Sequence, residues 1–361
     1  MADIRMWWDS GMGSHAEFVF VGGYTGDKGG AAEGIVRLRR DPASGLLTRL
    51  GVAARTPSPS FLTQHPTLPV LYAVNELDSD GTISAFTVAA DGELTPLSIQ
   101  PTGGSDPAHL SVTSDGRFLL VANYSSGSVA VHPLDAEGAP GERTDLLGLE
   151  GSGPDVERQR GSHAHMVVED RAGILISDLG ADRVWRCRLD PVSGRLTMLA
   201  PAVEAKPGTG PRHLRIAPDG TLLLVGELAA NLSWYRPAAD GSLELAGEVP
   251  AGEGAGPAFP SEIVCARDGR FIYVANRGPN TVSTFAWDGD GAVKVAETPT
   301  GGDWPRHMIL VGDHLYVTNQ LSHSVTTFRI DAETGTPLPV GEPMAEASPT
   351  CLLRWTSMPI R

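Results

Sequence analysis

Cysteine is scarce in this sequence, and its spacing excludes two common structural devices. The 361-residue chain has only Cys187, Cys265 and Cys351, which lie far apart and are odd in number. No CxxC pair is present. We therefore expect neither a disulfide framework nor a cysteine zinc site.

Basic residues are also few. Lys and Arg number 28 against 43 Asp and Glu, which gives a formal net charge of −15 and a pI near 5.0. Proteins that bind nucleic acid or anionic membrane surfaces usually carry the opposite charge, so we expect neither partner, although a local arginine cluster could still hold a small anion. No stretch reaches 18 uninterrupted apolar residues, so no membrane-spanning segment is predicted.

The start of the chain lacks the features of a secretory leader. Its first residues, MADIRMWWDSGMGSHA, contain no apolar stretch of the length found in signal peptides. We expect residues 1–16 to form a disordered or extended segment ahead of the folded domain, and the protein to be cytoplasmic. The sequence leaves the oligomeric state open.

Familiar catalytic motifs are missing as well. The sequence shows no HExxH, GxSxG or P-loop motif, and no GxGxxG after a predicted strand. These motifs usually indicate zinc-protease, serine-hydrolase or nucleotide-binding chemistry, so the sequence does not favour those functions. No cofactor and no metal are predicted. One alternative stays open, because His163 and His165 alternate along a predicted strand, which would place both rings on one side, where a metal site can begin.

What the chain does contain is turn-forming residues and a repeat. Gly (43) and Pro (28) make up about a fifth of the residues, which implies many short elements. One pattern, a Pro or Ser followed by polar and then apolar residues, recurs at intervals of 48, 55, 49, 49, 45 and 44 residues. Its seven copies are PSFLTQHP, PAHLSVTS, SHAHMVVE, PRHLRIAP, PSEIVCAR, PRHMILVG and PTCLLRW, starting at residues 59, 107, 162, 211, 260, 305 and 349.

Two further strand patterns accompany this repeat. A short apolar run with a polar or glycine-bearing corner, such as FLLVANYS or FIYVANRG, follows each of the first six copies and also opens the folded chain at Phe18. An alternating strand such as VSTFAW and a turn such as AADGELT come next.

The period and the copy number predict an all-β fold: a seven-bladed β-propeller with four antiparallel strands per blade. The chain opens with a second-type strand and ends with a first-type strand, so the C-terminal strand should complete the N-terminal blade and close the ring. We predict one propeller domain over residues 17–356 and a tail over residues 357–361. A pair of β-sandwiches is the alternative, but a period of this length is not typical of them.

This topology gathers polar residues around one mouth of the central channel. The first strand of each blade starts, and the second strand ends, at the same face of the ring. Any one of the residues there could simply form a turn, as Asn123 and Asp178 most readily would. Together, however, imidazole, guanidinium and carboxylate groups on one rim suit acid–base work on an anion. The corner residues are Glu76, His109, Asn123, Tyr124, His163, His165, Asp178, Arg212, His213, Glu227, Glu262, Arg277, Arg306, His307 and Gln320.

The corner motifs SHAHMVVED, GPRHLRIAPDG, GELAANLSWY, FIYVANR and PRHMILVGDHLYVTNQ resemble the lactonase family of seven-bladed β-propellers. That family includes 6-phosphogluconolactonases and, more distantly, carboxy-muconate lactonizing enzymes, and the resemblance covers nearly the whole folded chain. It implies a metal-independent enzyme that acts on a lactone or on the acid that forms one. Residue by residue, it implies active-site roles for His163 in preference to His165, and for Arg212, Glu227 and Arg277. Gly226 stands where related sequences often have Asn, which puts one polar contact to the substrate in doubt.

We therefore predict hydrolysis of a sugar-acid lactone, specifically 6-phosphogluconolactone, a small anionic substrate. Glu227 or His213 would take the proton of the attacking water, and two arginines would stabilise the anion. Arg306 is the obvious additional cation if the substrate carries a phosphate. The predicted catalytic residues are His163, Arg212, His213, Glu227 and Arg277. The predicted substrate-binding residues are Glu76, Asn123, His165, Arg306 and Gln320.

Two alternatives belong to other function classes. A cycloisomerase could use the same arginines to hold the two carboxylates of a muconate-type diacid. A non-enzymatic scaffold could use the propeller to bind a protein partner, but the sequence lacks the recurring WD signature of interaction propellers.

Overall fold

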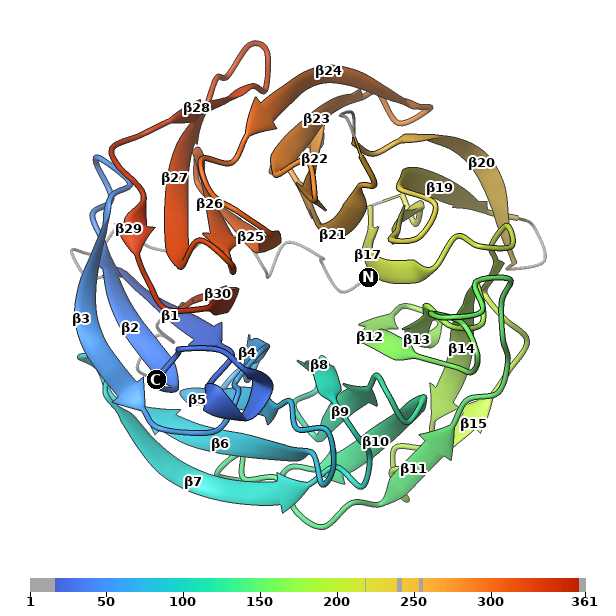
Figure 1. The fold of residues 1–361 in the computed structure, drawn as a ribbon. Helices are drawn as coiled ribbons and strands as arrows, with labels where there is room; N and C mark the ends of the chain where they lie inside the picture. Colours follow the sequence, from blue (N-terminus) through green and yellow to red (C-terminus); the bar gives the residue numbers. More distant parts are fainter. Residues whose placement is uncertain (1–16, 218, 239–241, 253–255, 357–361) are drawn as a thin grey trace.

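A computed structural model describes residues 17–217, 219–238, 242–252 and 256–356. Their strands form seven antiparallel sheets arranged in a ring (Figure 1), which confirms the predicted seven-bladed propeller. The predictions for residues 1–16 and 357–361 lie outside the described residues.

In each blade the strands follow one another from the innermost, next to the ring axis, to the outermost. Blade 1 contains β30 (Pro349–Arg354), β1 (Glu17–Gly23), β2 (Ile35–Arg40) and β3 (Leu47–Ala54). Blade 2 contains β4 (Leu62–Gln64), β5 (Val70–Asn75), β6 (Thr82–Val88) and β7 (Leu94–Pro101). Blade 3 contains β8 (Pro107–Val112), β9 (Phe118–Asn123), β10 (Ser128–Pro133) and β11 (Asp145–Gly148).

The other four blades repeat this order. Blade 4 contains β12 (Ala164–Asp170), β13 (Gly173–Asp178), β14 (Arg183–Leu189) and β15 (Leu196–Met198), with β16 (Val203–Glu204) also on β14. Blade 5 contains β17 (Pro211–Ile216), β18 (Leu222–Gly226), β19 (Asn231–Pro237) and β20 (Leu243–Pro250). Blade 6 contains β21 (Phe259–Cys265), β22 (Phe271–Arg277), β23 (Thr281–Trp287) and β24 (Ala292–Pro299). Blade 7 contains β25 (Pro305–Val311), β26 (His314–Asn319), β27 (Ser324–Ile330) and β28 (Pro337–Pro339), with β29 (Met344–Ala345) also on β27.

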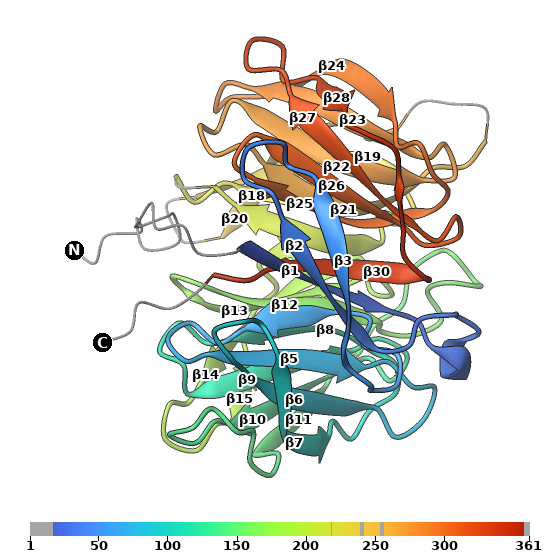
Figure 2. The same ribbon diagram turned by 90° about the vertical axis from the view of Figure 1, so that its left-hand side faces the viewer.

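The ring closes as predicted, because the two ends of the folded chain share one sheet. Strand β30 pairs antiparallel with β1, with Phe20 opposite Leu353 and Gly22 opposite Cys351. In Figure 2 the red β30 lies directly beside the blue β1. This pairing satisfies the backbone groups that an unpaired strand would otherwise expose.

The core lies between blades rather than within one sheet. Each apolar cluster joins facing side chains of two neighbouring blades; at the closure, Val19 and Leu352 of blade 1 pack with Val311 and Tyr316 of blade 7. A blade therefore buries both faces only when its neighbours are present. This arrangement fixes where each innermost strand starts, and hence where the polar corners lie.

The described residues include one short 3-10 helix, η2 (Gly26–Lys28), at the corner after β1. No helix in the described ranges is long and apolar enough to cross a membrane.

The closure predicts a measurable asymmetry between two leucines. Leu352 on β30 is 2% exposed, whereas Leu338 on β28 is 48% exposed. We expect Leu352→Ala to lower the free energy of unfolding by about 2–5 kcal/mol, since it leaves a cavity at the closure. Leu338→Ala should change it by no more than about 0.5 kcal/mol. Chemical denaturation of both variants tests this, and equal losses would contradict the closure as a site of tight packing.

Candidate active site

The innermost strands share a local irregularity that shapes the channel mouth. In β8, β12, β17, β21, β25 and β30 the pairing register shifts just after the strand begins, so that an extra residue stands opposite the second strand. Such a bulge re-aims side chains and lets consecutive residues both face the channel. The residues at the shift are Ala108, His165, Arg212, Ser261, Arg306 and Thr350.

Most of these bulge residues line one narrow pocket at the predicted mouth, with about 10 Å³ of space inside, enough for roughly one water molecule. The lining residues are Ser60, Phe61, Glu76, Ala108, His165, Arg212, His213, Arg306, His307 and Thr350. Five predicted site residues are therefore brought together here: Glu76, His165, Arg212, His213 and Arg306.

Beside the pocket, Glu227 is held by three arginines. Its Oε2 lies 3.0 Å from Arg212 Nε and 2.6 Å from Arg277 Nη2, and its Oε1 accepts a hydrogen bond of 2.8 Å from Arg158 Nη2. The Glu227, Arg212 and Arg277 side chains are all less than 10% exposed. Arg277 also donates from Nε to the Phe259 carbonyl at 3.0 Å.

The three arginines determine the protonation state in which Glu227 can act. Burial alone would raise its pKa, but Arg277, Arg212 and Arg158 outweigh burial and hold the pKa well below its usual range. A carboxylate in this state is a weak base. Burial and the neighbouring Arg277 in turn lower the pKa of Arg212 to about 9, which still leaves its guanidinium charged at neutral pH.

A second polar chain runs at the pocket from blade 2 through Tyr24 of blade 1 to Arg306 of blade 7. Tyr24 donates a hydrogen bond of 2.7 Å to Glu76 Oε1 and receives one of 2.6 Å from Arg306 Nη2. The Ser60 hydroxyl donates to the other oxygen of Glu76. Burial raises the pKa of Tyr24, so its hydroxyl stays neutral and remains a donor. Arg306 is thereby fixed with its charge in the pocket.

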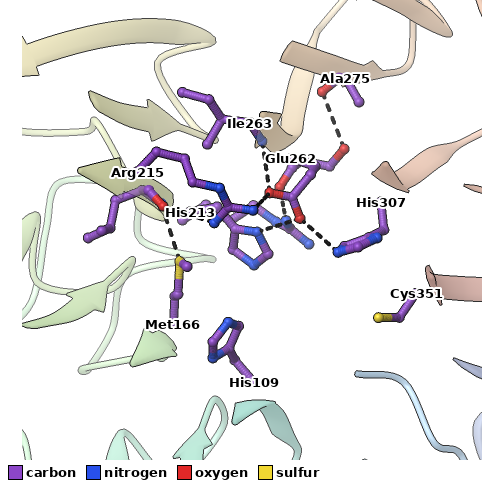
Figure 3. A network of polar contacts seen from close by, with 12 residues as sticks. His109, Met166, His213, Arg215, Glu262, Ile263, Ala275, His307 and Cys351 are labelled. Atoms are coloured by element: carbon purple, nitrogen blue, oxygen red, sulfur yellow. Dashed lines mark hydrogen bonds and ion pairs between the residues drawn. The ribbon is translucent and has the colours of Figure 1, made fainter. Parts of the chain in front are cut away.

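Glu262 of β21 joins three neighbours from two other blades (Figure 3). His213 Nδ1 lies 3.0 Å and His307 Nε2 3.1 Å from Glu262 Oε2, and Arg215 Nη2 lies 3.0 Å from Oε1. The Ile263 amide also donates to Oε1 at 2.9 Å. Burial would raise the pKa of Glu262, but His213, Arg215 and His307 hold it well below its usual range.

These contacts fix the tautomers of the two histidines. A carboxylate only accepts, so Nδ1 of His213 carries the proton and Nε2 has the free lone pair. His307 is reversed, because its Nδ1 accepts from the Leu352 amide at 3.2 Å and its Nε2 donates to Glu262. Burial lowers the pKa of each imidazole to about 4, so both are neutral at pH 7. Among the described residues, His213 Nε2 is buried and has no hydrogen-bond partner.

Of the two histidines in the SHAH segment, the structure places His165 in the pocket. Strand β12 begins at Ala164 and shifts register at His165, so the expected regular alternation of the two rings is not seen. His165 stands edge-on to His213, with ring centroids 5.1 Å apart, and burial holds its pKa well below the usual range. His163, which the resemblance favoured, is half-buried and stacks on Tyr124 at 4.6 Å, outside the residues that line the pocket.

Two other predicted substrate-binding residues also lie outside the lining. Asn123 is fully buried at the end of β9, where its Nδ2 donates to Ser128 Oγ at 3.2 Å and supports the blade corner. Gln320 is half-buried at the corner after β26, and its backbone amide donates to the Trp304 carbonyl at 3.1 Å. Both remain predictions as ligand contacts. In the described ranges, no group of three or more His, Cys, Asp or Glu side chains is arranged to hold a metal ion.

Sequence reasoning missed several contributors to the site. Arg158 lies in the loop before β12, outside every repeat element; the only hint was that the 55-residue interval ending at Ser162 is the longest of the six. Tyr24 follows β1 in the incomplete first copy, and Ser60 and Phe61 lie inside the PSFLTQHP copy, where nothing in the sequence marks them as site residues. Glu262 and His307 were recognised at the corners, but their mutual contact depends on side-chain reach across blades.

Comparisons with known proteins agree with this architecture. Residues 18–354 match the family model described as "Lactonase, 7-bladed beta-propeller". The chain is 30% identical to a 6-phosphogluconolactonase of Formosa agariphila over 88% of this chain and 93% of the relative. It is also 30% identical to the 6-phosphogluconolactonase of Bacillus subtilis over 88% of this chain and 92% of that one.

A solved structure gives the same result in three dimensions. The periplasmic gluconolactonase of Pseudomonas aeruginosa superimposes with a TM-score of 0.86 at 30% identity, covering 95% of this chain and 100% of that one. The match to the family model spans almost every described residue, and the seven closed blades are those of its fold. The chain therefore belongs to the lactonase family of seven-bladed β-propellers.

Proposed function

We propose that this protein hydrolyses the lactone ring of a sugar acid, and that its substrate is 6-phosphogluconolactone. Family membership and the names of its relatives support a lactone substrate. The observation that carries the proposal is the pocket itself, where Arg212 and Arg306 stand beside the neutral imidazole of His213. A cytoplasmic location fits the 6-phosphogluconolactone assignment, whereas the gluconolactonase neighbour is periplasmic.

His213 is better suited than Glu227 to activate the water. Glu227 is already paired with three arginines, and its pKa is strongly lowered. His213 keeps one nitrogen free because Glu262 holds the other. A buried imidazole oriented by a carboxylate is a common arrangement for a general base.

In the proposed reaction, His213 Nε2 takes a proton from water as the water oxygen attacks the lactone carbonyl carbon. Arg212 and Arg306 stabilise the oxyanion, since rigid guanidinium donors in a water-poor pocket stabilise developing charge well. The tetrahedral intermediate then breaks the bond to the ring oxygen, which receives the proton from the His213 imidazolium. Glu262 favours the transient imidazolium because its negative charge lies 3.0 Å from Nδ1.

The assay for this function is acid release from freshly prepared 6-phosphogluconolactone, followed in a pH-stat against the spontaneous rate. The purified protein should accelerate hydrolysis far above the uncatalysed background. A rate equal to the background would overturn the proposal. Cyclisation of carboxy-muconate by the same preparation, with no lactone hydrolysis, would favour the lactonizing alternative.

The assignment of the base predicts a specific mutational and pH response. His213→Gln should lower kcat by about 10²–10⁴-fold. Because the pKa of His213 is about 4, kcat/KM of the unmodified protein should stay level as the pH falls from 7 toward 5 and drop as the pH passes through 4, where the base becomes protonated.

His132→Gln is the matched control for this test. His132 is buried on β10 and contacts the Gly141 carbonyl at 3.0 Å, outside the residues that line the pocket. Its loss should affect stability but leave kcat of the folded protein unchanged. If Glu227→Gln abolished turnover while His213→Gln retained it, Glu227 would be the base instead.

A further inference from the structure

The loop that carries Arg158 is built to hold that side chain in place. Gln159 is 1% exposed, and its Nε2 donates to the Leu179 carbonyl at 2.9 Å and to Asp182 Oδ1 at 2.8 Å. Asp155 Oδ1 accepts from the amides of Glu157 and Arg158 at 2.9 and 3.0 Å. These contacts tie the segment between β11 and β12 to blade 4. The backbone at Arg158 is therefore positioned before any ligand arrives.

The Arg158 side chain lies at the partly exposed edge of the Glu227 cluster, outside the residues that line the pocket. It donates from Nη2 to Glu227 Oε1 at 2.8 Å and to the Tyr124 hydroxyl at 3.2 Å. Tyr124 is in turn braced by the stacked ring of His163, whose Nδ1 contacts the Tyr124 carbonyl at 3.0 Å. Arg158 is 38% exposed, whereas the Arg212 and Arg277 side chains are 3% and 7% exposed. Arg158 is thus the arginine of the Glu227 cluster that an incoming anion meets first.

The charges at this mouth favour a substrate that carries an anionic group away from its reacting carbonyl. Glu227 already faces two buried arginines, so Arg158 adds a positive charge that Glu227 alone does not neutralise. Arg306 is held in the pocket interior by its hydrogen bond to the Tyr24 hydroxyl. An anionic group near this exposed arginine would therefore gain a favourable contact with Arg158 at little desolvation cost.

We infer that Arg158 binds the phosphoryl group of a phosphorylated sugar lactone and so sets a preference for phosphorylated over unphosphorylated substrate. The inference rests on the proposed function and adds which residue recognises the phosphate. Arg158 and Arg212 contact the two oxygens of one carboxylate, so their guanidinium groups lie no further apart than the two ends of a six-carbon sugar phosphate. With the lactone carbonyl at Arg212, the far end of the substrate reaches Arg158, whose planar donors match a phosphate.

The experiment compares Arg158→Ala with the unmodified protein on 6-phosphogluconolactone and on unphosphorylated gluconolactone. The ratio of kcat/KM for the two substrates should fall about 10–100-fold, the effect of losing a charge-assisted contact to phosphate. Arg158→Lys keeps a point charge beside Glu227 and should lose less. Arg160→Ala is the matched control, because Arg160 is an exposed arginine of the same loop whose Nε donates to the Val156 carbonyl, and its ratio should not change.

Calorimetry with the products supplies a readout independent of turnover. The unmodified protein should bind 6-phosphogluconate more tightly than gluconate, and Arg158→Ala should remove most of that difference. Equal losses on both lactones, or an unchanged ratio, would overturn the inference. A preference of the unmodified protein for gluconolactone would also overturn it while leaving lactone hydrolysis intact. Conversely, Arg158-dependent binding of 6-phosphogluconate without hydrolysis of either lactone would defeat the proposed function and leave the phosphate site standing.

Discussion

The β-bulge at the start of the innermost strands is the constraint on which this site depends. A regular strand would turn alternate side chains away from the axis, whereas the shifted register places Arg212 and His213 together at the channel mouth. Equivalent shifts in blades 4 and 7 bring His165 and Arg306 to the same level. Residues about 50 positions apart in sequence thus become neighbours because six of the seven blades make the same local departure from ideal pairing.

Positive side chains that lie close together around one axis repel one another, and three buried glutamates offset this repulsion. Glu227 compensates Arg212 and Arg277, Glu76 acts on Arg306 through Tyr24, and Glu262 organises His213 and His307. A buried charge is costly unless it is paired, so these contacts are conditions for folding as well as for binding. The same pairing gives Glu227 and His213 different states. The carboxylate of Glu227 is occupied by its ion pairs with arginines, while His213 remains neutral with one ring nitrogen available.

The fold could be predicted because the repeat is a property of the sequence itself. Seven copies, their spacing and the out-of-phase ends required a closed ring, and strand β30 pairs with β1 as that argument demands. The mouth was likewise predictable, since Arg212, His213 and Arg306 follow a recurring proline. The partners of these side chains could not be predicted, because they depend on how far each side chain extends toward the neighbouring blades. Because of the bulge, His165 rather than His163 lies in the pocket. Arg158 comes from a loop that lies outside every repeat.

In the proposed reaction, the lactone carbonyl carbon is attacked beside His213, between Arg212 and Arg306. The most direct test is a crystal structure of the protein with 6-phosphogluconate, whose carboxyl carbon is the former lactone carbonyl. We expect this carboxylate to contact both guanidinium groups, with its carbon within reach of a water on His213 Nε2. A product molecule bound elsewhere, with these three side chains untouched, would contradict it.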